Sequence, residues 1–287
     1  MPGPGSAFKK LMAERSPLVA PGVFDGLSAG MARQAGFAAI YASGGAIARS
    51  FGLPDLGLVG MAEMAARLTQ IVEAAAAPVL ADGDTGHGTS LHLRRTIRSF
   101  ETTGIAGLHI EDQGFPKRCG HLAGKSLIAT TEMADKIKAA VDARLDDDFI
   151  IAARSDAIAV EGFDAALARA AAYREAGADI LFLEAPETPA QIAAIPQRLD
   201  APLMINMFRG GRTPFTAAGE LAALGYKLVI VPSDLQRAAI QAMGQVLAAI
   251  HRDGDSGAVS ELLCPLPERD TVVEQESWLA FANRFGG

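Results

Sequence analysis

The stretch Val79-Leu80-Ala81-Asp82-Gly83-Asp84-Thr85-Gly86 joins a short apolar run to two carboxylates and a glycine-rich turn. Such a run is typical of a buried parallel strand that carries its charges at its carboxyl end. Because strand side chains alternate between faces, Asp82 and Asp84 should point the same way, where two like charges repel unless one protonates or a cation joins them. Their oxygen ligands suit Mg²⁺ or Mn²⁺, and the alternative interpretation is two aspartates in a solvated turn.

Seven other apolar runs end in a polar or charged residue in the same way. They end within residues 23–25, 40–43, 108–112, 150–156, 181–184, 204–206 and 229–233. Segments of helical period lie between the runs, and four of these segments close at glycines typical of helix ends, Gly36, Gly104, Gly177 and Gly225. Eight strands alternating with helices predict an α/β fold, a closed (β/α)₈ TIM barrel, rather than an open doubly wound sheet. The strand ends and the active site should then share one rim.

The chain has 287 residues, of which 49% are hydrophobic, and a formal net charge of −7. This length suits one barrel, so we expect a single domain over residues 1–287 with a helical tail at about 252–287. The tail is surplus to the barrel, and it should either pack on a partner subunit or cap the barrel floor. The acidic balance argues against a nucleic-acid partner, and the sequence predicts no signal peptide and no membrane span. We therefore expect a cytoplasmic protein.

A long polar loop, residues 113–121, follows the fourth predicted strand. Loops of this length at the catalytic face of a barrel often act as mobile lids. Cys119 lies in sequence between Lys117 and His121, a cationic setting that lowers the pKa of a thiol and suits it to acid–base chemistry. A lone cysteine is more often a small buried apolar residue, and this is our interpretation of Cys264.

Three motifs together resemble the isocitrate lyase/phosphoenolpyruvate mutase superfamily. They are Tyr41-Ala-Ser43-Gly44-Gly45, Asp82-Gly-Asp84-Thr-Gly and Lys117-Arg-Cys119-Gly-His121. The similarity extends from Pro21 to about Arg237, which is most of the chain. It implies a barrel whose eighth helix is exchanged between neighbours, a magnesium site, and cleavage of a C–C bond beside a 2-hydroxy or 2-oxo acid. The assembly it implies is a homotetramer, a dimer of helix-swapped dimers.

The resemblance also implies roles for individual residues. Asp82 would bind Mg²⁺ (or Mn²⁺), and Asp84 and Glu111 would hold the ion largely through water, with Asp55 as a further candidate. The residues expected to bind the substrate are Ser43, Gly44, Gly45, Asp55, Arg154, Glu184, Asn206 and Arg237. The residues expected to act in catalysis are Cys119 as general acid, Tyr41 as the first candidate for the base, and Arg154, Lys117 and His121. No basic residue lies within sequence reach of the acids, which also favours a metal between them.

The loop cysteine is typical of the C–C lyases of this superfamily and is absent from its phosphonate-forming mutases. The chain is therefore similar to lyases of 2-methylisocitrate and of 2-alkylmalates. We expect a Mg²⁺-dependent lyase that cleaves a 2-hydroxy di- or tricarboxylate to an α-keto acid and a carboxylate. The alternatives are an oxaloacetate decarboxylase, or another α-keto acid enzyme of the superfamily, and a non-catalytic α-keto acid binding protein.

Two positions bear on the substrate. Relatives commonly carry a glutamate after the seventh strand, where this chain has Arg209. Arg209 either faces the pocket, where it would bind an altered or additional acidic group, or is solvated just outside it. Members that hydrolyse oxaloacetate tend to carry a serine near the end of the eighth strand, where this chain has Pro232, and this argues against hydrolysis.

Overall fold

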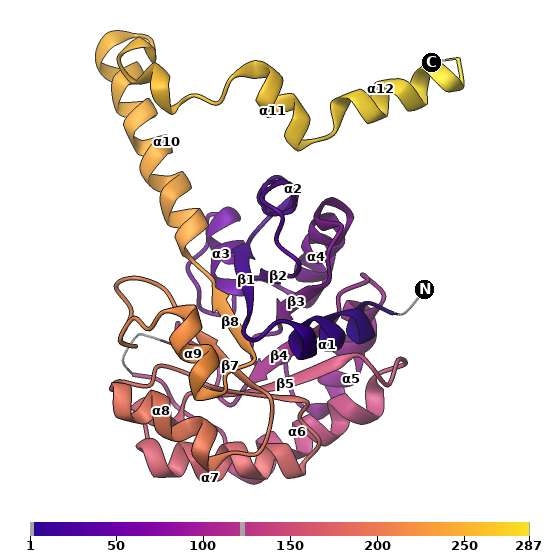
Figure 1. Ribbon diagram of the computed structural model, residues 1–287. Helices are drawn as coiled ribbons and strands as arrows, with labels where there is room; N and C mark the ends of the chain where they lie inside the picture. The colour runs from indigo at the N-terminus through magenta and orange to yellow at the C-terminus, as the bar shows by residue number, and fades with distance from the viewer. Residues whose placement is uncertain (1–2, 121–123, 287) are drawn as a thin grey trace.

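The computed structural model describes residues 3–120 and 124–286, and its centre is a closed barrel of parallel strands in sequence order (Figure 1). The strands are β1 Leu18–Val23, β2 Ile40–Ala42, β3 Val79–Asp82, β4 Gly107–Glu111, β5 Ile150–Ser155, β6 Ile180–Leu183, β7 Leu203–Asn206 and β8 Leu228–Val231. The barrel closes between β1 and β8, with Leu18 opposite Leu228. The predicted TIM barrel is confirmed, and each strand ends at or shortly before its predicted end.

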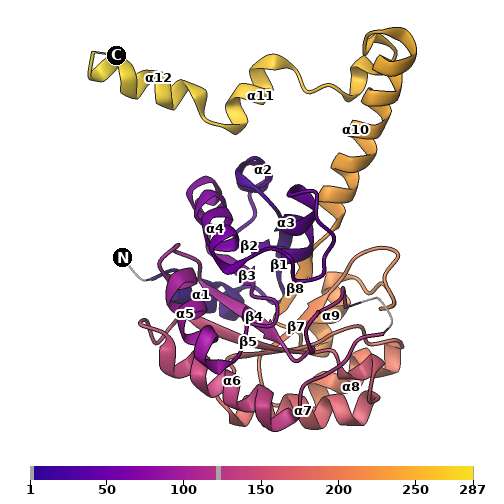
Figure 2. The ribbon, with the colours of Figure 1, turned by 180° about the vertical axis from the view of Figure 1, so that it is seen from behind.

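Helices alternate with the strands, and all but the last three helices of the chain lie around or beneath the barrel (Figures 1 and 2). They are α1 Pro4–Glu14, α2 Gly26–Gln34, α3 Gly44–Ser50, α4 Met61–Ala75, α5 Ser90–Glu101, α6 Thr130–Ala143, α7 Phe163–Glu175, α8 Pro189–Arg198, α9 Ala218–Leu224, α10 Asp234–Asp253, α11 Leu266–Val272 and α12 Gln275–Arg284. The four glycines predicted at helix ends, Gly36, Gly104, Gly177 and Gly225, all have left-handed φ angles between 78° and 110°. These helix ends are therefore confirmed.

The apolar core forms two layers. The larger layer lies between strands and helices and includes Leu68 of α4 and Phe100 of α5. A second layer fills the barrel itself, where Leu80 and Phe182 pack with Phe8 of α1, all nearly or fully buried. Because α1 packs against this inner layer with residues at the start of the strands, such as Leu18, it covers the barrel floor. The alternative in which the C-terminal tail caps the floor is therefore wrong.

Strand alternation places polar groups directly above the inner layer. Residues two apart on a strand share a face, so an inward apolar residue is followed two positions later by an inward polar one. Such pairs are Leu80 and Asp82, Ala152 and Arg154, Phe182 and Glu184, and Met204 and Asn206. The carboxyl ends of neighbouring parallel strands meet on one rim, and these polar side chains are brought together there.

The C-terminal part of the chain leaves the barrel. Figure 1 shows α10 projecting away from it and α11 and α12 running outside it. On α10 the buried residues are Gln236 and Ala249. Farther along, α11 lies beside α2, and just beyond α11 the Oε2 atom of Glu274 is 2.8 Å from Arg33 Nη1 of α2. In the described part of the chain, no helix combines the length and the hydropathy needed to cross a membrane.

Candidate active site

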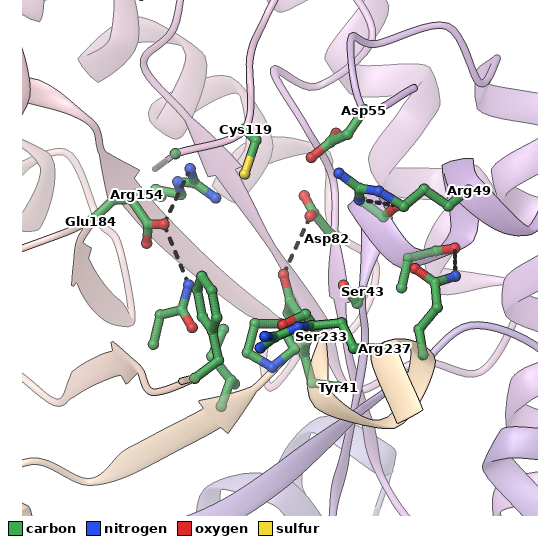
Figure 3. Close-up of a pocket in the computed structure, with 18 of the residues that line it drawn as sticks. Tyr41, Ser43, Arg49, Asp55, Asp82, Cys119, Arg154, Glu184, Ser233 and Arg237 are labelled. Atoms are coloured by element: carbon green, nitrogen blue, oxygen red, sulfur yellow. Dashed lines mark hydrogen bonds and ion pairs between the residues drawn. The ribbon is translucent and has the colours of Figure 1, made fainter. Parts of the chain in front are cut away.

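A cavity of about 290 Å³ opens at the carboxyl ends of the strands (Figure 3). Its lining includes these residues singled out from the sequence: Tyr41, Ser43, Gly45, Asp55, Asp82, Lys117, Cys119, Arg154, Glu184, Asn206 and Arg237. Gly44, Asp84 and Glu111 are buried behind that lining. His121 lies outside the described residues. The cavity volume suits a small organic acid rather than a macromolecule.

Asp82, the last residue of β3, is the best connected carboxylate of the cavity. Its Oδ2 accepts hydrogen bonds from Tyr41 Oη at 3.3 Å and from the backbone N–H of Gly44 at 3.2 Å. Its Oδ1 accepts from the backbone N–H of Asp84 at 3.0 Å and lies 3.4 Å from His109 Nε2. Burial opposes ionisation, but His109 and nearby cationic side chains hold the pKa of Asp82 well below its usual value. The N–H of Gly44, expected to bind substrate, is directed at Asp82 in this structure.

Asp84 and Asp55 are joined by a lysine. The Nζ atom of Lys117 lies 2.5 Å from Asp84 Oδ1 and also forms an ion pair with Asp55. The expectation that the acids have no basic partner is therefore wrong, because the loop brings Lys117 in from a distant part of the sequence. Asp84 lies beyond the end of β3 with a φ of 48°, so strand alternation does not extend to it, and it lines a separate cavity. Burial raises its pKa to about 6, against the opposing effect of Lys117.

Glu111, at the end of β4, has an unusual environment for a carboxylate. It is 1% exposed, its Oε2 lies 3.3 Å from Arg154 Nε, and its Oε1 has no hydrogen-bond partner among the described residues. Burial raises the pKa of Glu111 well above its usual value. A buried oxygen of this kind normally faces water or a cation.

The arrangement of these carboxylates suits a divalent cation that keeps several water ligands rather than one whose ligands all come from the protein. Within residues 3–120 and 124–286, no group of three or more His, Cys, Asp or Glu side chains is arranged to hold a metal directly. Mg²⁺ commonly keeps several waters and takes only one or two carboxylates from the protein. Asp82 could supply a direct ligand, and Glu111, Asp84 and Asp55 could be reached through water.

Arg154, at the end of β5, is the main cation of the cavity. It is 8% exposed, its Nε donates to Asp156 Oδ2 at 2.9 Å, and its Nη2 lies 3.8 Å from Glu184 Oε1. Asn206 Nδ2 donates to the same Glu184 oxygen at 3.3 Å. Burial disfavours the charged form of Arg154, but Asp156 and Glu111 raise the pKa of Arg154 well above its usual value. Sequence reasoning gave no role to Asp156, although its place two residues after Arg154 was a usable signal.

Tyr41 of β2 is coupled to a histidine that sequence reasoning missed. The Tyr41 hydroxyl lies 2.8 Å from His109 Nε2, and the two rings stack with centroids 5.9 Å apart. Burial raises the pKa of Tyr41 well above its usual value and lowers that of His109. Tyr41 is therefore a phenol, whereas for His109 burial favours the neutral imidazole and the neighbouring Asp82 opposes it. The signal for His109 was its position two residues before Glu111, on the same face of β4.

Cys119 lies on the loop above this rim. Figure 3 shows its thiol pointing into the cavity between Arg154 on one side and Asp55 on the other. The loop is braced by Gln113, whose side chain donates to the carbonyl of Arg118 and accepts from its N–H, both at 2.8 Å. Lid motion of this loop stays a prediction.

Lining residues to which the sequence analysis gave no role include Arg49, Ser233 and Gln236. Arg49 Nη1 donates to the carbonyl of Gly45 at 2.7 Å, which is explained by its position one turn farther along α3. Ser233 directly follows Pro232, and both line the cavity. A serine therefore lies in the cavity one residue beyond Pro232, and the argument against hydrolysis, which concerns the position of Pro232 itself, stays a prediction.

Two sequence expectations concern residues away from the cavity. Arg209 is exposed, and its guanidinium carbon lies 4.2 Å from the centroid of the Phe215 ring. Of the two alternatives for Arg209, the structure shows the one outside the pocket. Cys264 is exposed on the tail, so its interpretation as a buried apolar residue is wrong. Asp25, another strand-end carboxylate, caps α2 by accepting from Ser28 N at 2.7 Å.

A TIM barrel with carboxylates, an arginine clamp and a thiol at one rim defines an enzyme for small anionic substrates. The model of the family described as phosphoenolpyruvate phosphomutase matches residues 8–251. The chain belongs to the phosphoenolpyruvate mutase/isocitrate lyase superfamily, as its motifs predicted.

Named relatives agree with this membership. The 2,3-dimethylmalate lyase of Eubacterium barkeri is 42% identical over 270 residues, 94% of this chain and 93% of the relative. The 2-methylisocitrate lyase of Aeropyrum pernix is 43% identical over 251 residues, 88% of this chain and 81% of the relative. A crystal structure of 2,3-dimethylmalate lyase superposes with a TM-score of 0.94 at 35% identity, covering 100% of this chain and 97% of that one. A structure of phosphonopyruvate hydrolase with oxalate and Mg²⁺ has a TM-score of 0.90 at 29% identity and full coverage of both chains, 100% and 100%.

Proposed function

We propose that this protein is a Mg²⁺-dependent carbon–carbon lyase. Its substrate is a 2-hydroxy di- or tricarboxylate of the 2-methylisocitrate or 2-alkylmalate type, and its products are an α-keto acid and a second carboxylate. The observation that carries this proposal is the convergence of the Cys119 thiol, the Arg154 guanidinium and the Asp82 carboxylate on one cavity. The names of the relatives, 2,3-dimethylmalate lyase and 2-methylisocitrate lyase, support it.

The charges of the cavity support a substrate with more than one carboxylate. Arg49, Arg154 and Arg237 contribute guanidinium groups to its lining from three different elements. Guanidinium groups bind carboxylates through paired, charge-assisted hydrogen bonds. Ser43 and Gly45 offer a hydroxyl and a backbone N–H for the carboxylate next to the 2-oxygen, and Arg154 holds the 2-oxygen itself.

The proposed metal site uses the carboxylates described above. Asp82 would bind Mg²⁺ directly, and Asp84, Glu111 and Asp55 would hold it through water. When bound, the ion supplies Lewis acidity to the 2-oxygen of the substrate. The orphaned Glu111 oxygen and the Mg²⁺ in the related phosphonopyruvate hydrolase structure support this assignment.

Two proton transfers complete the reaction. The substrate hydroxyl loses its proton as the C2–C3 bond breaks, and the bonding electrons go to C3, which becomes the enolate of the departing carboxylate. Because Tyr41 is a phenol, it can accept the hydroxyl proton only while its own proton, which is donated to Asp82 in the structure, turns to His109 Nε2, 2.8 Å away. Cys119 gives its thiol proton to C3, and the α-keto acid remains.

The test is a panel assay with Mg²⁺ present. Purified protein is given 2-methylisocitrate, isocitrate, 2-alkylmalates and oxaloacetate, and the α-keto acid, acetate, oxalate and CO₂ released are measured separately. A C–C lyase releases an α-keto acid from a 2-hydroxy acid. Oxalate and acetate from oxaloacetate would instead identify a hydrolase, pyruvate and CO₂ a decarboxylase, and no turnover of any compound would leave only a binding protein.

We also propose that the active enzyme is a homotetramer, a dimer of helix-swapped dimers. The support is the direction of α10, which leaves its own barrel with Ile240, Met243 and Leu247 exposed. Apolar side chains in such a row normally pack against another surface.

A further inference from the structure

Lys125 is a buried cation that the proposed reaction does not use. It follows the described end of the catalytic loop and is 9% exposed. Its ammonium group donates to the backbone carbonyl of Gly120, the residue after Cys119, and to Asp156 Oδ1 at 2.8 Å. A single side chain therefore contacts both the loop that carries the proposed acid and the buried end of β5.

Asp156 is the other half of this connection. It is fully buried, and its two oxygens accept from Arg154 Nε at 2.9 Å and Arg154 Nη2 at 3.1 Å. Its backbone N–H donates to Asp112 Oδ1 at 2.9 Å, and Asp112 Oδ2 in turn accepts from Tyr173 Oη at 2.8 Å. Asp156 is therefore fixed from behind, and the plane of its carboxylate sets the orientation of the Arg154 guanidinium.

The charges show why a second cation is needed here. Arg154 faces the carboxylates of Asp156, Glu111 and Glu184. Lys125 also neutralises part of the negative charge of Asp156. The positive charge of Arg154 is therefore less fully compensated by Asp156 and can interact more strongly with a ligand on the cavity side. A buried carboxylate with a single partner would hold that partner more tightly.

Gly120 links the same groups from the loop side. A β-carbon added at Gly120 would overlap Glu184 and Arg154, so its backbone lies directly against this ion pair. Displacement of the Gly120 carbonyl would therefore move Cys119 and disturb the arginine together.

We propose that Lys125 is a positioning residue that fixes Cys119 and Arg154 relative to one another through Gly120 and Asp156. This inference rests on the proposed lyase reaction, in which Cys119 donates a proton while Arg154 holds the substrate oxygen. Errors of about 1 Å in such an arrangement can reduce turnover by as much as a hundredfold.

The experiment compares Lys125→Met, which keeps the stem and removes the charge, with Lys125→Arg and with the control Lys138→Met. Lys138 is an exposed lysine of α6 that pairs only with Asp135 among the described residues. The readouts are kcat and KM, thermal stability, and the rate at which iodoacetamide alkylates Cys119 relative to Cys264, measured peptide by peptide. The exposed Cys264 serves as an internal reference in the same sample.

We expect Lys125→Met to lower kcat by about tenfold or more and to change the Cys119 to Cys264 rate ratio by about threefold or more. Lys125→Arg should restore most of both, and Lys138→Met should change neither. An unchanged rate ratio in Lys125→Met, or a loss of stability that the arginine variant does not rescue, would overturn the proposal. If wild-type protein turns over no substrate, the lyase assignment fails separately, while the alkylation ratio still decides whether Lys125 positions Cys119.

Discussion

Cys119 carries the proposed proton transfer, so its replacement gives the sharpest test at the scale of single residues. We expect Cys119→Ser to lose most of its turnover while still binding an α-keto acid product, because a serine hydroxyl is a far weaker acid than a thiol. Alkylation should inactivate wild-type protein, and bound product should protect it. The measurements are steady-state kinetics and product binding by calorimetry. Alkylated protein with full activity would show that Cys119 is structural.

Asp82 tests the metal site, and Asp25 is its matched control, because both are strand-end carboxylates. We expect Asp82→Ala to abolish turnover and to remove the rise in melting temperature that Mg²⁺ produces in wild-type protein, because the direct ligand is lost. Asp25→Ala removes the cap of α2 and should cost about 1 kcal/mol of stability while it keeps the Mg²⁺ response.

Differential scanning fluorimetry with and without Mg²⁺ measures the melting temperatures, and chelation with EDTA should reverse the Mg²⁺ effect. Full activity after exhaustive chelation would contradict the metal assignment.

Variants of Arg237 and Arg209 compare an arginine that lines the cavity with a neighbouring arginine that lies outside it. Arg237 lines the cavity and its Nη1 donates to the backbone carbonyl of Arg209 at 2.6 Å, a bond that does not need the Arg209 side chain. We expect Arg237→Gln to raise KM for a tricarboxylate about tenfold, because one charge-assisted hydrogen bond to the substrate is lost. Arg209→Gln should leave this KM unchanged. Steady-state kinetics on 2-methylisocitrate and a dimethylmalate check this, and an equal effect of both variants would place specificity elsewhere.

The residues of the site were only partly predictable from sequence. Asp82, Arg154 and Glu184 were predictable because they follow inward apolar residues at strand ends. The ion pair of Lys117 with Asp84 was not, because it depends on the path of a long loop, which no local pattern encodes. Arg49 was missed for a related reason, since its place in the cavity depends on the direction of α3.

At the scale of elements, strands and helix ends were predictable because each depends on local sequence. A short apolar run can bury both faces only inside a parallel sheet, and a glycine beyond a helix permits a left-handed turn. The direction of α10 was not predictable from its own residues, because an amphipathic helix can bury its apolar face against any barrel. The contact of α11 with α2 likewise depends on where the long helix ends.

The end of β5 gives a prediction about stability and pH. Burial alone would raise the pKa of Asp156, but Arg154 and Lys125 lower it from 3.8 to about 2. A carboxyl group with a lowered folded-state pKa stabilises the protein above its unfolded pKa, and this stability is lost as the pH falls through the folded value. The shift corresponds to about 2 kcal/mol.

We therefore expect Asp156→Asn to be less stable than wild type at pH 7 by at least this order, with the difference shrinking between about pH 4 and pH 2. Urea unfolding at a series of pH values and one fixed protein concentration measures it. A stability difference that does not change across this range would mean that Asp156 contributes no net ionic stabilisation.

For the whole molecule, the barrel buries its own core, but the C-terminal part does not. The exposed apolar residues of α10 and the tail are Ile240, Met243, Leu247, Ile250, Leu262, Leu263, Leu266, Val273, Trp278, Leu279, Phe281 and Phe285. A monomer would hold all of them in water, which is unfavourable for so long a series of large side chains. The barrel was predictable from one chain, whereas the surface on a second copy that we propose covers these residues has no signal in local sequence.

The chain has one tryptophan, Trp278 of α12, whose side chain is exposed in the single chain. If α10 and the tail pack on a second copy, Trp278 should be buried at high protein concentration, with blue-shifted fluorescence that moves to the red on dilution. Analytical ultracentrifugation should show the same two samples as a tetramer and a smaller species. Mutation of an exposed lysine of the barrel, Lys138→Glu, should change neither readout. Red-shifted emission at every concentration, with a monomer in the ultracentrifuge, would contradict the helix-swapped assembly.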